Sequence, residues 1–442
     1  MIGYPQEQRS LNKEQKEAVG LLSIGTCLEY FDLMIYVHMA GFINELFFPK
    51  TDPHTTALYY AGAFCATYLL RPLGALIFGW IGDNIGRKST VIITTFMMSS
   101  ACVVMANLPT YEQIGILATW LVTICRVVQG MSSMGEVVGA ELYLTEMLHP
   151  PIQYASVGLI GACAVLGTVG ALAIASLVVC CGINWRIAFW IGAIIAFVGS
   201  VARTKLREAP EFADAKRRIK KVFKITNTDI NILKNDPIWQ EKVNKKTVIA
   251  FFLLQCALPV CVYFIYIYCG NILKTSFGYT LSEVIHHNFL VCIMELLTTL
   301  ILCCLSLKVY PLLIIKITLL IFSIFIIFCP YLLNNLNSPY QLFFIQFFIV
   351  LWKQCLNPAT SICLKSFPIF KRFTYASMTF SVSRAMIYVI SAFGFVYLVE
   401  YFGNWGIWFI MIPIIIGFTY GLLHFEKLTK IAKIIHSENC IV

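Results

Sequence analysis

Charged residues are scarce in this chain. Of its 442 residues, 13% are Asp, Glu, Lys or Arg and 59% are hydrophobic, and the mean hydropathy is +0.77. A soluble globular protein is about one quarter charged. The composition therefore excludes a typical soluble protein and indicates that most of the chain lies in a lipid bilayer.

Residue sets that would support catalysis or metal binding are also missing. The 17 cysteines lie mostly in apolar stretches and show neither paired C-x-x-C spacing nor the His spacing typical of metal sites. We interpret them as small buried hydrophobic residues. The sequence contains no nucleophile–base set and no phosphate-binding loop, so we expect no enzymatic activity, no metal and no cofactor.

Long apolar runs dominate instead. A cleavable signal is not evident, because the first apolar run is too long for a signal-peptide core, and we interpret that run as a membrane anchor. A membrane-spanning helix needs about 20 mainly apolar residues. Twelve runs qualify: 17–41, 56–80, 89–108, 113–142, 154–181, 185–203, 247–270, 286–307, 309–333, 340–364, 375–401 and 404–424.

The twelve runs form two groups of six. They predict an all-α integral membrane protein whose twelve transmembrane helices form two six-helix, pseudo-symmetric halves. The predicted parts are an N-terminal tail (1–16), a first half (17–203), a linker (204–246), a second half (247–424) and a C-terminal tail (425–442).

The net charge of +10 indicates topology and not a nucleic-acid partner. Thirteen of the 33 Lys and Arg residues lie between Arg203 and Lys246, and both tails are basic, whereas the opposite face has few cations, such as Lys50. Cytoplasmic loops carry the excess of Lys and Arg. We therefore expect both termini and the linker to be cytoplasmic.

Several charged residues fall inside the predicted spans. A charge at bilayer depth costs about 2.5–3.5 kcal/mol or more, so each is expected to face a cavity or a partner. They are Glu29, Asp32, Arg71, Arg126, Glu136, Glu295, Lys353 and Arg384.

Glu29 and Asp32 are three residues apart and therefore lie on one helical face, with Tyr36 one turn beyond. Two carboxylates in a low-dielectric site repel each other, so one tends to hold a proton near neutral pH. This pattern suits a proton carrier. The alternative is a structural pair neutralised by Arg71 or Arg126.

A short glycine-spaced turn joins the second and third predicted spans. It contains Gly79, Asp83, Gly86, Arg87 and Lys88. The glycines allow close backbone packing, and Asp83 is suited to accept hydrogen bonds from a helix N-terminus, where the macrodipole favours an anion. The alternative is a polar turn with no role beyond connection.

Five motifs in the first half resemble those of the metabolite:proton symporters within the major facilitator superfamily, with the proline/betaine branch nearest. They begin at Gly25 (GTCLEYFD), Arg71 (RPLG, followed by GDNIGR), Arg126 (RVVQGMSSMGE), Trp185 (WRIAF) and Leu206 (LREAPEF). The resemblance is good over residues 20–215 and weak over 365–385, where Phe367, Pro368 and Arg372 match.

The resemblance implies a proton-coupled symporter of the bacterial inner membrane that imports a small polar osmolyte or metabolite, such as proline or glycine betaine, by alternating access. It also implies that the turn at Asp83 is a cytoplasmic gate and that Arg126 belongs to proton coupling. Glu136 is either part of that coupling set or a structural partner of the turn. We expect a monomer, with the proton as coupling ion.

Substrate contacts are expected from cations and aromatic residues. The guanidinium fork of Arg71 suits a carboxylate, unless Arg71 pairs with a buried acid. Lys353 and Arg384 are further candidates, unless Glu295 neutralises one of them. Tyr30 and Tyr36 suit a quaternary ammonium through cation–π contact, although aromatic residues are common in spans.

Two alternatives to an osmolyte symporter stay open. One is a symporter of carboxylates such as α-ketoglutarate, shikimate or citrate. The other is a non-transporting receptor or a decayed transporter, because the turn at 306–312 lacks the Asp and Gly-Arg found in the first half. Retained cations in the second half, such as Lys353 and Arg384, argue against decay.

Overall fold

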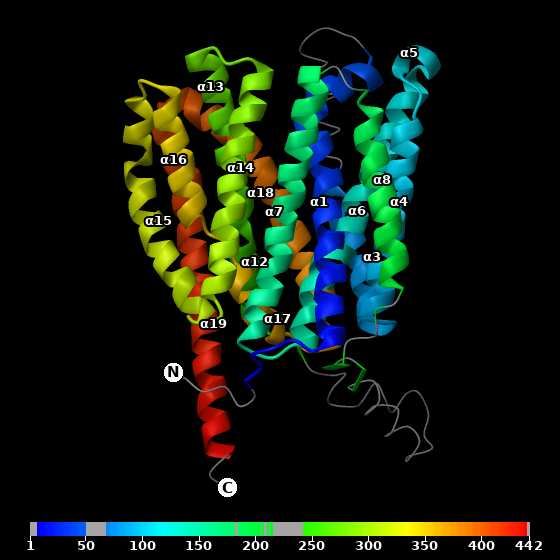
Figure 1. Cartoon of the computed structure of the whole chain (residues 1–442). Helices are drawn as coiled ribbons and strands as arrows, with labels where there is room; N and C mark the ends of the chain where they lie inside the picture. The colour runs from blue at the N-terminus through cyan, green and yellow to red at the C-terminus, as the bar shows by residue number, and fades with distance from the viewer. Residues whose placement is uncertain are drawn as a thin grey trace.

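The computed structural model describes residues 7–49, 68–181, 184–204, 206, 210–211, 213–214 and 242–439, and these residues form a bundle of long helices (Figure 1). The first half of the bundle contains α1 (Lys13–Phe47), α3 (Arg71–Asn84), α4 (Arg87–Asn107), the short α5 (Tyr111–Ile114), α6 (Ile116–Met147), α7 (Ile152–Cys181) and α8 (Arg186–Arg203).

In the second half, one span contains a π-helical segment and another contains a non-helical break. The helices of this half are α12 (Lys245–Val262), η1 (Tyr263–Tyr268), α13 (Cys269–Phe277), α14 (Leu281–Leu305), α15 (Pro311–Asn334), α16 (Pro339–Trp352), η2 (Asn357–Ala359), α17 (Thr360–Lys365), α18 (Arg372–Phe402), η3 (Gly403–Gly406) and α19 (Ile407–Asn439). The π-helix η1 continues α12 directly into α13, so these three elements form one span.

The prediction of twelve spans in two groups of six agrees with these helices. Residues 56–67 of the second predicted span and residues 215–241 of the predicted linker lie outside the described residues. Nine described stretches are long and apolar enough to cross a membrane, and the last of them, Arg372–Ile431, holds both α18 and α19.

The tenth span, predicted over 340–364, is found as a candidate span over Pro339–Lys365, but it contains a break that the sequence analysis did not predict. In the structure α16 ends at Trp352, residues 353–356 are not helical, and the chain resumes through η2 and α17. Pro358 explains part of the break, because proline lacks a backbone N–H and disfavours helical geometry at the preceding residue. α19 continues to Asn439, so most of the predicted C-terminal tail (425–442) is helical.

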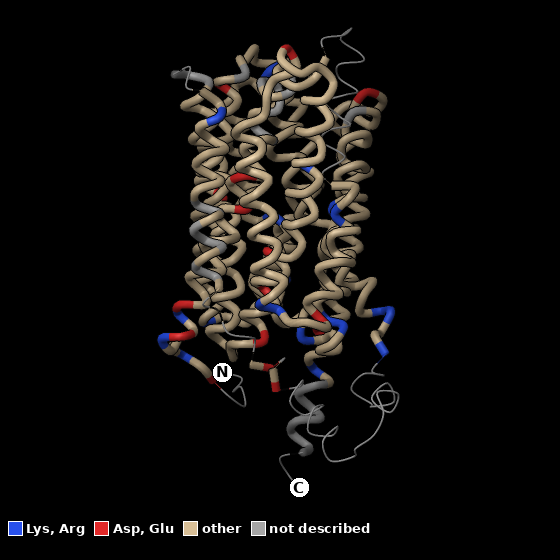
Figure 2. The backbone as a smooth tube through the Cα atoms, turned by 90° about the vertical axis from the view of Figure 1, so that its right-hand side faces the viewer, with Lys and Arg blue, Asp and Glu red and all other residues tan. Residues whose placement is uncertain are grey.

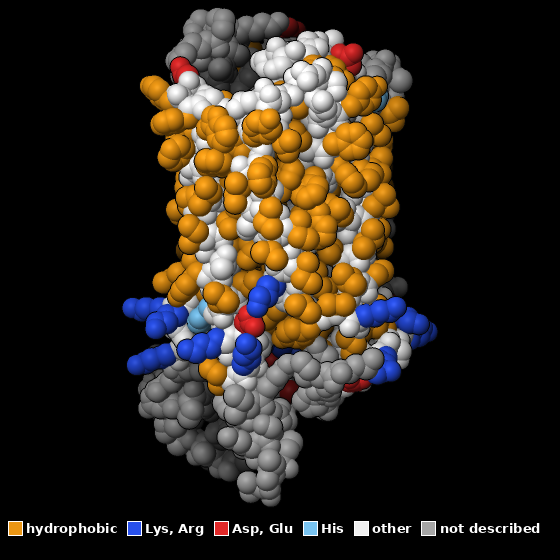
Figure 3. Space-filling view, turned by 90° about the vertical axis from the view of Figure 1, so that its left-hand side faces the viewer, with side chains coloured by type: hydrophobic (Ala, Val, Ile, Leu, Met, Phe, Trp, Pro, Cys, Tyr) orange, Lys and Arg blue, Asp and Glu red, His pale blue; other side chains and the backbone are white. Residues whose placement is uncertain are grey.

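The two ends of the bundle differ in charge. Lys and Arg side chains gather at the end from which α19 projects, below a broad hydrophobic surface (Figure 3), and few charges lie along the middle of the bundle (Figure 2). We call this end the basic end and the opposite one the distal end. The start of α1 lies at the basic end as well (Figure 1).

The largest core cluster shared by the two halves lies at the basic end. It joins Leu142 of α6 to Phe251 of α12 and Phe373 of α18. At the distal end, Phe47 belongs to a cluster of the first half and Phe395 to a cluster of the second.

Towards the distal end the halves meet through α7 and α14, where Leu172 packs with Ile285 and Ser176 Oγ lies 3.1 Å from His286 Nε2. This arrangement leaves space between the halves that begins near mid-bundle.

Small residues bring the helices of the first half close together. Gly167 of α7 lies against the backbone of α1, and a Cβ at this position would lie 2.0 Å from the carbonyl oxygen of Cys27. Small residues permit such close helix packing in membranes. The α1–α7 contact therefore depends on glycine at position 167.

Gly167→Ala is expected to lower the thermal unfolding midpoint of the purified protein. The added methyl group collides with backbone atoms, and overpacking of this kind costs about 1–3 kcal/mol. Gly20→Ala is the matched control on α1, because nothing lies within 4 Å of a Cβ there. Equal midpoints for the two variants in a thermal melt in detergent would contradict the tight contact.

Candidate functional site

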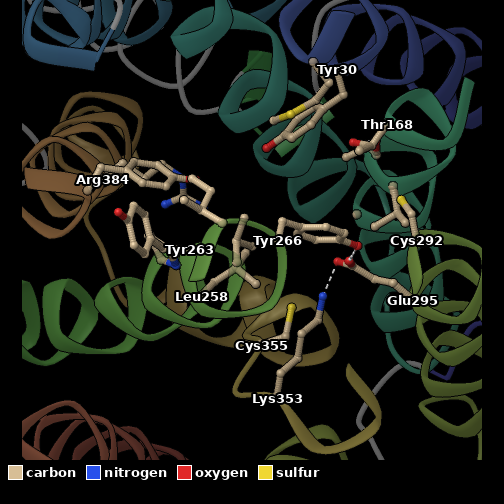
Figure 4. Close-up of a pocket in the computed structure, with 18 of the residues that line it drawn as sticks. Tyr30, Thr168, Leu258, Tyr263, Tyr266, Cys292, Glu295, Lys353, Cys355 and Arg384 are labelled. Carbon is tan, nitrogen blue, oxygen red and sulfur yellow. Dashed lines mark hydrogen bonds and ion pairs between the residues drawn. The ribbon is translucent and has the colours of Figure 1, made fainter. Parts of the chain in front are cut away.

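A cavity of about 530 Å³ lies between the two halves and is the main candidate site (Figure 4). Side chains of α1, α6 and α7 line it from the first half, and η1, α14, α18 and the break after α16 line it from the second. Its polar and charged lining includes Tyr30, Glu141, Tyr266, Glu295, Lys353 and Arg384. Lys274 of α13 also lines it, which extends the cavity towards the distal end.

Arg384 of α18 is a buried cation of this cavity and has no ion pair among the described residues. Its guanidinium carbon lies 3.2 Å from the ring centroid of Phe380, and its Nη1 donates long hydrogen bonds of 3.4 Å to Gln255 and to the Phe380 carbonyl. Glu141 of α6 is buried at the same cavity. The described residues include no ion pair between Arg384 and Glu141, so the two halves present opposite charges to one space.

Lys353 and Glu295 form a second charged set at the cavity. Lys353 Nζ makes an ion pair with Glu295 Oε1, and Tyr266 Oη donates a hydrogen bond to Glu295 Oε2 (Figure 4). The sequence analysis left open whether Glu295 neutralises Lys353 or Arg384. The structure assigns it to Lys353.

Asp32 lies away from the cavity, in a relay between α1 and α6. Gln129 Nε2 donates to Asp32 Oδ2, and Arg126 Nη1 donates to Gln129 Oε1 at 2.9 Å. The Arg126 guanidinium lies 4.0 Å from the ring centroid of Tyr36. Arg126 therefore reaches the acid through Gln129, and Tyr36 contacts Arg126 and is not part of the cavity lining.

The remaining predicted charges are buried beside these sets. Glu29 and Glu136 are 2% and 1% exposed. Arg71 lies with its guanidinium 4.3 Å from the ring centroid of Tyr68, a residue that lines the cavity. Arg71 Nε and Nη2 have no hydrogen-bond partner among the described residues. An ion pair of Arg71 with a buried acid, the alternative to substrate binding, is absent from the described part of the chain.

The turn after α3 holds the halves together at the basic end. Asp83 accepts hydrogen bonds from Phe373 N at 3.0 Å, Thr374 N at 2.8 Å and Thr374 Oγ1 at 2.7 Å, all in the first turn of α18. Asp83 therefore accepts hydrogen bonds from a helix N-terminus, as the sequence suggested, and its role in gating stays a prediction. Gly79 permits the approach, because a Cβ there would lie 2.8 Å from Thr374 Cα.

Arg87 completes this contact, which we call the latch, from a fully buried position. It forms ion pairs with Asp83 at 3.0 Å and Glu146 at 2.9 Å and donates to the Ile369 carbonyl at 2.7 Å. Glu146 also pairs with Arg372 at 3.1 Å. The latch therefore joins α3, α4 and α6 to the start of α18.

The other two residues of the predicted gate lie at its edge. Gly86 has φ 153° and ψ 155°, a conformation essentially restricted to glycine, and it ends the turn before α4. Lys88 is half-buried in the first turn of α4.

Three contributors were missed from the sequence. Glu141 lies near the end of the span predicted over 113–142 and was given no role, and α6 runs on to Met147. Gln129 was noted within a motif without a role. Glu146 lay beyond the predicted span. Extending the predicted helix by five residues, to Met147, would have placed Glu146 inside the protein as well.

Comparison with known proteins shows what this chain is similar to. Residues 22–368 match the model of the Major Facilitator Superfamily. A putative metabolite transport protein of Haemophilus influenzae is 34% identical over 222 residues, which are 48% of this chain and 49% of the relative. The proline/betaine transporter of Escherichia coli is 31% identical over 208 residues, 45% of this chain and 41% of the relative. The chain thus spans about half the length of the curated relatives it matches.

Solved structures share the fold at low sequence identity. The proton:xylose symporter XylE, bound to 6-bromo-6-deoxy-D-glucose, superposes with a TM-score of 0.75 at 13% identity, over 94% of this chain and 95% of that one. The human organic anion transporter MFSD10 superposes with a TM-score of 0.64 at 12% identity, over 93% and 100% of the two chains. With the family match over most of the chain, these findings establish that the chain belongs to the Major Facilitator Superfamily.

Proposed function

We propose that this protein is a proton-coupled symporter that imports a small polar solute bearing a carboxylate, by alternating access between its two halves. The observation that carries the proposal is a cavity between the halves to which Arg384 and Glu141 bring opposite charges from the two sides. Relatives named as metabolite and proline/betaine transporters support the solute class.

A zwitterion is the first candidate solute. The planar guanidinium of Arg384 is suited to bind a carboxylate through two parallel hydrogen bonds. Glu141 and the ring of Tyr30 line the same cavity and suit an ammonium group by charge and by cation–π contact. Binding would bring α6 and α18 together around the solute, which is the movement that alternating access requires.

A simple carboxylate such as α-ketoglutarate or shikimate is the second candidate. Lys353 and Lys274 line the cavity together with Arg384 and give it additional positive charge. A solute with two carboxylates would use two of these cations.

Proton coupling is assigned to Asp32 and its relay through Gln129 to Arg126. The carboxylate is buried and its contact to a cation is indirect, so a proton is an effective substitute for the missing charge. Protonation would weaken the relay between α1 and α6. Tyr30 lines the cavity and lies on α1 together with Asp32. A movement of α1 caused by protonation of Asp32 would therefore also move Tyr30.

The orientation follows from the charge distribution. We assign the basic end to the cytoplasm of a bacterial cell, since cytoplasmic segments carry the excess of Lys and Arg. The latch then closes the cytoplasmic side while the cavity extends towards the outside through Lys274.

The proposal is tested by uptake into proteoliposomes with an imposed inward proton gradient. We expect uphill accumulation of one solute among radiolabelled proline, glycine betaine, α-ketoglutarate and shikimate, lost on adding a protonophore. Absence of uptake of any of the four by folded and correctly oriented protein would contradict the proposed solute class and favour a non-transporting role.

Asp32→Asn is expected to abolish accumulation against a gradient and to leave counterflow exchange of the same solute active. The amide keeps the shape of the side chain and one acceptor oxygen for Gln129 Nε2, but it cannot take up a proton. Glu112→Gln, at an exposed acid of α5, is the matched control and should accumulate normally. Undiminished uphill uptake by the Asp32 variant would remove Asp32 from the coupling role.

Asp83→Asn is expected to loosen the latch. The change removes the charge that faces the start of α18, and a hydrogen bond to a charged group contributes about 1.5–3 kcal/mol. Amide hydrogen exchange at Phe373 and Thr374, followed by mass spectrometry of the peptide that spans them, should accelerate about tenfold or more. Asn84→Ala, at an exposed neighbour, should leave exchange unchanged. Equal protection in both variants would show that Asp83 does not hold the halves.

A further inference from the structure

The break in the tenth span places non-helical backbone at membrane depth. Cys355, Leu356 and Asn357 line the cavity, with Lys353 at the end of α16 where the helix stops. Irregular backbone is tolerated at this depth where it is buried in protein or lines a cavity, and interrupted spans commonly form binding sites in transporters. The break therefore marks a candidate binding site, with Lys353 at its edge.

The charged residue beside the break is Lys353, and its partner set is small. Lys353 is 8% exposed and Glu295 6% exposed, and both line the cavity. Tyr266 of the π-helix η1 holds the second oxygen of the Glu295 carboxylate. The η1 backbone is itself supported, because Gln346 Nε2 donates to the Ile265 carbonyl at 2.7 Å. The carboxylate is thus fixed on both oxygens.

The ammonium group of Lys353 has fewer hydrogen-bond partners than donors. An ammonium has three N–H donors, and within the described part of the chain Glu295 Oε1 is the acceptor that Lys353 Nζ contacts. Donors therefore remain on a cation that lines the cavity. A carboxylate entering the cavity is the chemical group that would complete this set.

The surroundings contain little that could neutralise either partner in its place. From α7 the cavity lining presents the uncharged residues Ala164, Val165 and Thr168. The titratable groups that face the pair from the other packed elements are Tyr266, Cys261, Cys292 and Cys355, with Glu141 near Cys355. The net charge of the pair is therefore decided by Lys353, Glu295 and what enters the cavity.

A buried pair must remain close to neutral. Separating one partner from the other leaves an uncompensated buried charge, which is strongly destabilising. If the carboxylate of a solute binds Lys353 in place of Glu295, the carboxylate of Glu295 must be neutralised by another positive charge. That charge can come from a proton or from an ammonium group carried by the same solute.

We propose that Lys353 is a carboxylate subsite that is occupied by exchange: the solute's carboxylate replaces Glu295 on Lys353, and Glu295 is neutralised by a proton or by the solute's own ammonium group. The proton comes from the aqueous solution and binds Glu295 Oε1 as the ion pair with Lys353 opens, while Tyr266 Oη continues to donate to Oε2. This inference rests on the proposed function, because a carboxylate reaches Lys353 only if solutes enter the cavity.

The two sources of positive charge are separated by two probes of equal shape. Glycine betaine carries a permanent ammonium charge, and 3,3-dimethylbutanoate is its isostere with carbon in place of nitrogen. Isothermal titration calorimetry in buffers of different ionisation enthalpy measures the protons taken up by the purified, full-length protein. We expect uptake of about one proton with 3,3-dimethylbutanoate, whose affinity falls about tenfold per pH unit, and none at this site with glycine betaine.

Variants of the pair separate charge from structure. Glu295→Gln should bind 3,3-dimethylbutanoate without proton uptake and without pH dependence. Lys353→Met should lose about tenfold or more in affinity for both probes. Because Lys353→Met leaves Glu295 buried without a cation, the double variant Lys353→Met/Glu295→Gln is the safer form, and it should show the same loss with no buried charge left.

The matched control is Lys316→Met on α15, which removes a lysine that is paired with Glu426 at 3.6 Å on the exposed surface and should leave binding unchanged. The inference is overturned if neither probe binds the unmodified protein, if the double variant retains affinity, or if 3,3-dimethylbutanoate binds without proton uptake. Uptake into proteoliposomes by the double variant at unchanged affinity would overturn the subsite and leave the transport function standing. Lys353-dependent binding without uptake of any solute would support the subsite and contradict the transport function.

Discussion

Compensation of buried charge is the constraint on which this structure depends. An ionised group at membrane depth is expensive unless a partner or a cavity receives it. The protein meets this requirement in three different ways: Asp32 is reached indirectly through Gln129, Lys353 is paired directly with Glu295, and Asp83 is placed between Arg87 and the start of α18. Arg384 and Arg71 have no ion pair among the described residues. Arg384 has an aromatic ring and two long hydrogen bonds as its contacts, and Arg71 lies against the ring of Tyr68.

The same constraint explains why the halves close at the basic end. The anion of Asp83 is stabilised by the N-terminus of a helix in the other half, so separating the halves removes a partner from a buried carboxylate. Arg87 and Glu146 would lose part of their surroundings in the same step, because Arg87 also donates to the Ile369 carbonyl. Closure by charge, unlike closure by apolar packing alone, reverses when water reaches these groups, which suits an interface that has to open and close.

Local sequence patterns predicted the helices and the latch turn, and did less well on contacts between distant segments. Asp83 could be assigned to a helix N-terminus because the turn fixes its position, but the amide groups it binds belong to Phe373 and Thr374, about 290 positions away in the sequence. The break after Trp352 was hidden by an apolar composition that continues on both sides of it. Gln129 was overlooked because it is uncharged. Its role becomes visible only when the structure shows that it bonds both Arg126 and Asp32.

The contrast between two cations in one cavity carries a functional distinction. Arg384 is available to a solute without losing an ion pair, since its contacts are an aromatic face and two long hydrogen bonds. Lys353 is available only when Glu295 is neutralised, since each ion of a buried pair depends on the other. A solute with one carboxylate therefore has a first contact that is always open, whereas the second contact is conditional on a positive charge. Under the proposed mechanism, such a cavity would distinguish solutes first by the charge they carry and then by their shape.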